Sequence, residues 1–192
     1  MKASLLYSRS IVALSQSVPL STAQPLRTHS IHAINARAVW SEWLHEVAAW
    51  SLAVTITFKR YHEGQSINHS IAQAALSHTL RVLDVYCFGK RGVKQGQHVG
   101  TAAVLSWGAY GQQPHAHLAL STPSDMSVEV LQERFEQAAD KTNWLARERV
   151  VKPYRDAGWI NYLIDHNPDN LVVPLLRPGS DPATSLPHRL VT

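Results

Sequence analysis

The amino-acid sequence predicts an α+β domain in which a central antiparallel sheet is covered by helices. Segments whose apolar residues alternate with a period of two lie between segments whose apolar residues recur at helical spacing. A short connection with two glycines, residues 108–113, joins two of the predicted strands as a hairpin. The 192 residues suffice for one sizeable core. We therefore expect a poorly ordered leader or arm over residues 1–37, a single domain over 38–176 and a tail over 177–192.

The composition indicates a globular and moderately basic protein. Hydrophobic residues make up 45% of the chain, and the net charge of +4 permits a polyanionic partner without requiring one. The single cysteine, Cys87, excludes an internal disulfide and a cysteine-based zinc cluster. Apolar runs stay shorter than a membrane span, and Arg9 and Ser10 interrupt the hydrophobic start of the chain. We expect a cytoplasmic protein without membrane association.

The first predicted helix and the first predicted strand differ in their apolar spacing. Val39, Trp43 and Val47 recur at four-residue steps, which predicts a helix over 38–50. Residues 51–59 alternate instead and are rich in β-branched side chains, which predicts a strand. A polar loop over 60–65 follows, and Ser66 or Asn68 then caps a helix that runs to about residue 88.

The segment 89–97 combines three glycines with three cations, Lys90, Arg91 and Lys94. We interpret it as a flexible loop that contacts phosphate, because mobile Lys and Arg side chains neutralise a nucleic-acid backbone without reading its sequence. A solvated turn is the alternative.

The rest of the chain alternates between strands and helices. Strands are predicted over 98–107, 114–120 and 147–153. A helix begins near Ser127, because Val128, Leu131 and Phe135 share one face. A last helix, capped by Asp156, runs to about residue 166 and is stopped by the Asn-Pro pair at 167–168.

The strand after the hairpin carries two histidines. In Pro114-His115-Ala116-His117-Leu118, strand alternation places His115 and His117 on one face and the apolar residues on the other. Two imidazoles one strand repeat apart can bind one metal ion as neutral nitrogen donors. A chance pair in a chain with 11 histidines is the alternative.

Three motifs stand in order along the chain: the strand Leu52-Ala53-Val54-Thr55-Ile56-Thr57-Phe58, the His-hydrophobic-His strand, and a helix with Gly158-Trp159-Ile160-Asn161-Tyr162-Leu163. As an ordered set, over about residues 51–167, they resemble the HUH endonuclease superfamily, specifically the rolling-circle replication initiators of phages and plasmids. The resemblance implies a ferredoxin-like or RRM-like sheet, with both histidines on its middle strands and the tyrosine helix lying across them.

The resemblance also implies a reaction. His115 and His117 would hold Mg²⁺ or Mn²⁺ against the scissile phosphate of single-stranded DNA. Tyr162 would attack the phosphorus and form a 5′-phosphotyrosine link, leaving a free 3′-hydroxyl. The implied partners are single-stranded DNA at a replication origin and, because the chain carries no helicase motif, a host helicase and polymerase.

Three further residues are candidates for supporting roles. His166, four residues after Tyr162, could share its helix face and act as a base or proton shuttle. Lys152 and Arg155 could contact phosphate, with solvated side chains as the alternative. Tyr154 is a competing nucleophile, although Pro153 before it indicates the end of a strand.

Two positions depart from the family's pattern. Ser106 stands where the family usually has an acidic third metal ligand. Either water takes this ligand position or another residue does, with His98, His62 and Glu63 as candidates. Asp165 stands where a lysine is common. These departures favour an alternative, a catalytically silent module of the same fold that binds single-stranded nucleic acid. A transposase or relaxase with the same chemistry, and an unrelated α+β protein with an incidental histidine pair, are further alternatives.

Overall fold

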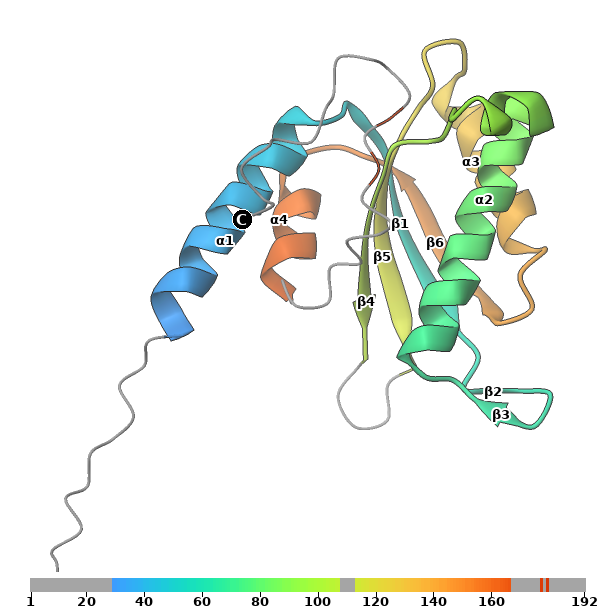
Figure 1. Ribbon diagram of the computed structural model, residues 1–192, viewed down its shortest axis with the longest axis horizontal. Coiled ribbons are helices and arrows are strands. Elements are labelled where there is room, and N and C mark those ends of the chain that lie inside the picture. Colours follow the sequence, from blue (N-terminus) through green and yellow to red (C-terminus); the bar gives the residue numbers. More distant parts are fainter. Residues whose placement is uncertain (1–28, 108–112, 167–176, 178, 180–192) are drawn as a thin grey trace, which may run out of the picture.

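The computed structural model describes residues 29–107, 113–166, 177 and 179 (Figure 1). Its elements in chain order are α1 (His29–Glu46), β1 (Trp50–Phe58), β2 (Tyr61–His62), β3 (Gln65–Ser66), α2 (His69–Lys94), β4 (Thr101–Ser106), β5 (His115–Ser121), α3 (Val128–Ala139), β6 (Leu145–Pro153) and α4 (Gly158–His166). Helices pack on a four-stranded antiparallel sheet, which confirms the predicted fold class.

The sheet has the strand order β4-β5-β1-β6, and every neighbouring pair is antiparallel. The succession β1-α2-β4-β5-α3-β6 is the β-α-β-β-α-β arrangement of ferredoxin-like folds. β5 carries both histidines and is one of the two middle strands. In its register with β1, His117 lies opposite Thr55 and His115 lies opposite Thr57.

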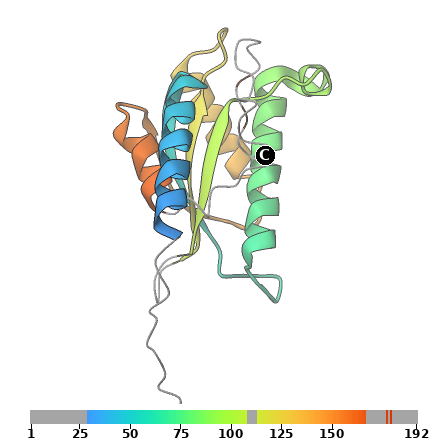
Figure 2. The same ribbon diagram turned by 60° about the vertical axis from the view of Figure 1, so that its left-hand side comes forward.

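The two faces of the sheet are covered by different helices. On β1, Leu52, Val54, Ile56 and Phe58 are buried in a core shared with α2 and α3. The residues between them, among them Thr55, point to the opposite face because side chains alternate along a strand. Figures 1 and 2 show α1 and α4 on that second side of the sheet and α2 on the first. Both histidines of β5 therefore face α4.

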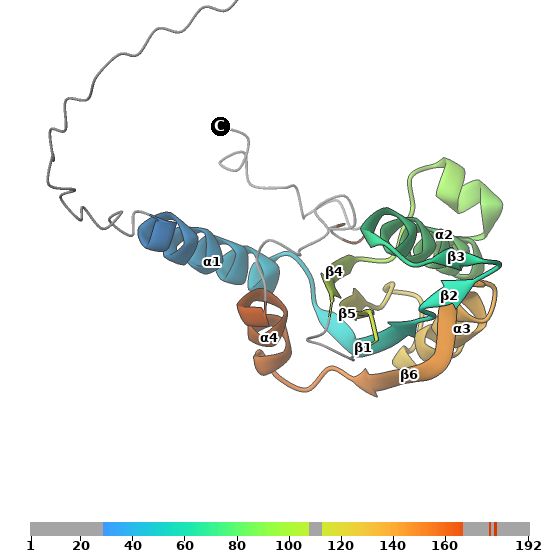
Figure 3. The same cartoon turned by 90° about the horizontal axis from the view of Figure 1, so that it is seen from below.

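A second apolar cluster joins α1 and α4 to the sheet. Its buried members include Trp43, Leu44, Trp50, Ile160 and Leu163. Figure 3 shows α1 and α4 side by side, away from α2 and α3.

The predicted helix over 38–50 is wrong at both ends. The helix begins at His29, inside the predicted leader, and Trp50 already belongs to β1, where its indole N–H donates to the Leu44 carbonyl at 2.6 Å. Residues 1–28 lie outside the described residues.

Local turn and cap signals account for most of the other boundaries. Asn68 caps α2, because its side-chain oxygen accepts the Ile71 N–H at 2.9 Å. Ser127 caps α3 in the same way. The predicted polar loop over 60–65 contains the β2–β3 hairpin, in which Glu63 (φ 49°) and Gly64 (φ 78°) both have the positive φ of a type I′ turn.

The interpretation of 89–97 as a flexible loop is wrong. Gly89 takes a φ of 67°, which kinks α2, and the helix then continues to Lys94. After the cap residue Gln95, Gly96 takes a φ of 86°, the Gln97 N–H donates to the Gly92 carbonyl and the Gly96 N–H donates to the Val93 carbonyl. The exposed residues of this helical end include Lys90, Arg91 and Lys94. Arg91 and Lys94 lie in the last turn, where positive side chains interact favourably with the helix dipole.

Arg177, the first residue of the predicted tail, is joined to the sheet. Its backbone pairs with Thr101 at the edge of β4. Its Nη1 donates to Asp84 at 2.6 Å, and this buried carboxylate also accepts the Val99 N–H at 2.9 Å. The rest of the predicted tail, apart from Gly179, lies outside the described residues. Among the helices that the structure describes, none has the length and apolar character to cross a membrane.

Candidate active site

Four side chains from three elements meet on the face of the sheet that α4 covers. His117 comes from β5, Thr55 from β1, and Trp159 and Tyr162 from α4. The His117 ring centroid lies 5.0 Å from that of Tyr162 and 5.5 Å from that of Trp159, in edge-on contacts. His117 itself is 6% exposed. The predicted convergence of a β5 histidine and the helical tyrosine is therefore present.

Both ring nitrogens of His117 have hydrogen-bond partners. Nδ1 lies 3.0 Å from Thr55 Oγ1, across the β1–β5 pair. Nε2 lies 3.3 Å from the Tyr162 hydroxyl. A neutral imidazole with Nδ1–H donated to Thr55 can accept the phenol proton at Nε2. The orientation of this ring is thus fixed from both sides, and its Nε2 points to the tyrosine.

His115 lies beside His117 and is half-buried. The two rings are 4.8 Å apart between centroids, at 78° to each other. His115 Nδ1 donates to the Gln113 carbonyl at 3.0 Å. A ligating histidine is commonly oriented in this way, by donation of its other ring N–H to a carbonyl. With both Nδ1 atoms engaged, Nε2 is the nitrogen that each histidine could offer to a metal, and that of His117 lies 3.3 Å from the Tyr162 hydroxyl.

The predicted third ligand is not found among the described residues. Ser106 lies directly opposite His115 on β4, in the position predicted for it. His98 lies beyond the other end of β4, next to Val99, whose N–H binds Asp84. His62 packs on Trp144 and pairs with Glu63 at 3.5 Å in the β2–β3 hairpin. Within the part of the chain that the structure describes, no three His, Cys, Asp or Glu side chains form a group that could hold a metal.

Trp159 anchors α4 over the site. Its indole N–H donates to the Leu118 carbonyl of β5 at 2.9 Å. Its ring stacks on Tyr162, with centroids 5.3 Å apart and an angle of 14°. Asp156 begins the helix, because its carboxylate accepts the Gly158 N–H at 2.8 Å. Trp159 lies one helical turn before Tyr162, a spacing that places both side chains on one face of α4.

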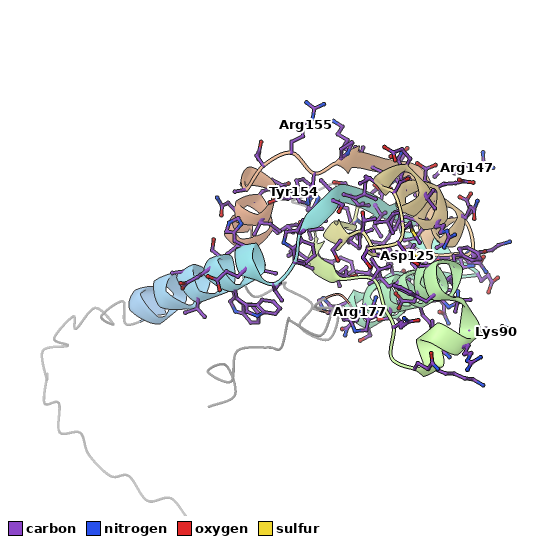
Figure 4. All side chains as sticks on the ribbon, turned by 90° about the horizontal axis from the view of Figure 1, so that it is seen from above. Lys90, Asp125, Arg147, Tyr154, Arg155 and Arg177 are labelled. Atoms are coloured by element: carbon purple, nitrogen blue, oxygen red, sulfur yellow. The ribbon has the colours of Figure 1, made fainter. Side chains whose placement is uncertain are left out.

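The predicted phosphate-binding residues fall into two separate groups. Lys152 and Arg155 line a cavity of about 800 Å³ together with Trp159 and Tyr162. Lys90, Arg91 and Lys94 lie on the kinked end of α2, and Figure 4 shows Lys90 and Arg155 on opposite sides of the domain. Only the first group can act at the tyrosine.

The remaining predicted site residues contribute less. His166 belongs to the last turn of α4, but its side chain and that of Asp165 lie outside the described residues. Burial and the nearby Asp156 raise the pKa of the Tyr154 phenol, which disfavours its ionised form. Its backbone N–H donates to the Ser51 carbonyl, and its ring packs against the α1–α4 cluster.

Comparisons of the chain with protein-family models, with curated proteins and with solved structures give no match.

Proposed function

We propose that the protein is a tyrosine-dependent nickase of single-stranded DNA that initiates rolling-circle replication. One observation carries this proposal: the hydroxyl of a helical tyrosine lies 3.3 Å from a buried histidine that is one of a pair on a middle strand. A half-buried phenol in this position is accessible from the neighbouring cavity, where Lys152 and Arg155 supply positive charge. A nucleophile, a nitrogen pair for a cation and cations for the DNA backbone are thus adjacent.

His115 and His117 fit two of the ligands of a divalent cation. Their Nδ1 atoms are engaged with Gln113 and Thr55, so their Nε2 atoms are the donors. Bound there, Mn²⁺ or Mg²⁺ would neutralise charge on the scissile phosphate, with water and phosphate oxygens filling the remaining positions. Imidazole ligands favour Mn²⁺, since Mg²⁺ prefers an all-oxygen shell.

In the reaction, Tyr162 Oη attacks phosphorus and the bond from phosphorus to the 3′-oxygen breaks. The products are a 5′-phosphotyrosine and a free 3′-hydroxyl, so the phenol proton is balanced by the proton that the 3′-oxygen gains. His117 Nε2 can either accept the hydrogen bond from Tyr162 or serve as a ligand. If His117 Nε2 held a metal ion, the Tyr162 hydroxyl would lose this hydrogen bond and would be free to turn to the phosphorus.

Incubation of the protein with end-labelled single-stranded DNA and Mn²⁺ tests the proposal. We expect cleavage with a protein–DNA adduct that resists denaturation and is lost in Tyr162→Phe. Tyr154→Phe is the matched control and should keep the adduct. His117→Ala should abolish metal-dependent cleavage but keep most of the affinity for single-stranded DNA, because the basic side chains supply it. Cleavage by His117→Ala would contradict the metal role.

A second candidate function is a silent module that binds single-stranded DNA without cutting it. The observation in its favour is Ser106 opposite His115, because a serine hydroxyl is a poor substitute for a carboxylate ligand. Retention of DNA without any adduct, in Mn²⁺ and in Mg²⁺, would favour this candidate. A transposase or relaxase would form the same adduct and differ only in the DNA sequence that it selects.

A further inference from the structure

The cavity beside Tyr162 combines apolar and aromatic walls with two cations, and the nicking reaction alone does not require these walls. It lies between β1, β6 and the start of α4 and has a volume of about 800 Å³. Its lining residues are Ala53, Thr55, Val150, Lys152, Pro153, Arg155, Asp156, Gly158, Trp159 and Tyr162. Ligand sites commonly have this size and combine apolar walls with a few polar groups.

The walls of the cavity are apolar and aromatic. Val150 projects from the edge strand β6 and is 48% exposed, so its apolar side chain is available at the cavity wall. Ala53, opposite Lys152 on β1, and the stacked rings of Trp159 and Tyr162 complete this surface. A flat aromatic ligand is suited to such walls, because base–aromatic stacking does not depend on the identity of the base.

The charges around the cavity favour an anionic backbone. Lys152 and Arg155 are both exposed, and Figure 4 shows Arg155 extending outward from the connection between β6 and α4. The one acid, Asp156, is engaged with the Gly158 N–H at the start of α4, where a carboxylate is stabilised by the helix dipole. Phosphates can therefore lie at the rim while an uncharged ring enters the cavity.

We infer that the cavity binds one unstacked nucleobase of single-stranded DNA, from a nucleotide next to the scissile phosphate. This inference rests on the proposed function, because it places the scissile phosphate at Tyr162. A base in a duplex is paired and stacked, so only a single strand can deliver one without a cost of extrusion. The cavity thus holds the strand in position for attack and discriminates against duplex DNA.

An abasic scan tests the inference. The probe is a fluorescein-labelled single-stranded oligonucleotide, selected from a random pool by binding to the full chain. Each position in turn is made abasic, and the dissociation constant is measured by anisotropy. One position should lose affinity by roughly tenfold, the effect of a lost base–aromatic stack. Equal affinity at every abasic position would overturn the inference.

Substitution of the cavity wall assigns the effect to this cavity. Val150→Asn should shrink the abasic penalty at that one position. Val130→Asn is the matched control, because Val130 is also an exposed valine (37%) but lies on α3, and it should leave the penalty unchanged. A penalty unchanged in Val150→Asn would overturn the inference.

The failure of the inference is distinguishable from the failure of the proposed function. If the protein nicks DNA but the loss of affinity at the abasic position does not depend on Val150, only the base site is overturned. A penalty that depends on Val150, in a protein that forms no adduct with any probe, supports the base site and overturns the nickase.

Discussion

Replacing Thr55 by valine removes one hydrogen bond and keeps the shape of the side chain. The bond joins Thr55 Oγ1 to His117 Nδ1 at 3.0 Å, and His117 is 6% exposed, so the abandoned nitrogen cannot readily find water. An unsatisfied buried donor costs about 1–3 kcal/mol. Loss of a partner that orients a metal ligand typically lowers metal affinity or activity by about 10–100-fold. We expect both effects in Thr55→Val, measured by denaturant unfolding and by single-turnover cleavage in Mn²⁺.

The matched control is Thr57→Val, the same substitution two residues along the same face of β1, opposite His115. It should change cleavage and stability little, because Thr55 keeps its hydrogen bond to His117 Nδ1 and valine keeps the β-branched shape that suits a strand. Thr55→Ser should restore most of the activity and the pH profile of cleavage, since the hydroxyl returns. If Thr55→Val cleaves as fast as Thr57→Val, the hydrogen bond does not position His117 and the reasoning is refuted.

Three other predictions concern single groups. Tyr162→Phe should bind Mn²⁺ about 2–10-fold more tightly in calorimetry, because a hydrogen bond of about 0.5–1.5 kcal/mol no longer competes at His117 Nε2, and weaker binding would contradict this. Burial and the charge of Arg177 lower the pKa of His98 in the folded protein. As the pH is lowered, this histidine therefore binds a proton in the unfolded chain before it does so in the folded one, and the free energy of unfolding should decrease at pH values under about 6.5. His98→Gln should reduce that fall in melting temperature, and an unchanged fall would refute the assignment. Burial raises the pKa of Cys87 to about 11, so iodoacetamide should modify it slowly at neutral pH until urea unfolds the protein, and rapid native modification would refute this.

The first strand, β1, could be predicted because its buried and partly exposed residues alternate strictly. The buried positions of β1, from Leu52 to Phe58, all lie on one face, and the caps Asn68 and Ser127 mark where helices begin. The kink at Gly89 could not be predicted, since a glycine next to lysines and arginines is equally typical of a loop. Arg177 could not be predicted either, because its partner Asp84 lies far away in the sequence and only the folded chain brings the two together.

Only part of the candidate site could be predicted from the sequence. Alternation along β5 fixes that His115 and His117 share a face, but it does not say which helix covers them. The register of β1 against β5 selects Thr55 as the partner of His117, and no local pattern encodes that register. The cavity beside Tyr162 arises from three elements at once, so its lining could not be derived from one segment.

Peptide mapping of a covalent adduct tests the central claim most directly. The protein is incubated with single-stranded DNA and Mn²⁺, the DNA is digested, and the modified peptide is sequenced by mass spectrometry. The account predicts a nucleotide joined through its 5′-phosphate to Tyr162. A nucleotide on Tyr154 or on any other residue, or cleavage that leaves no adduct, would contradict it.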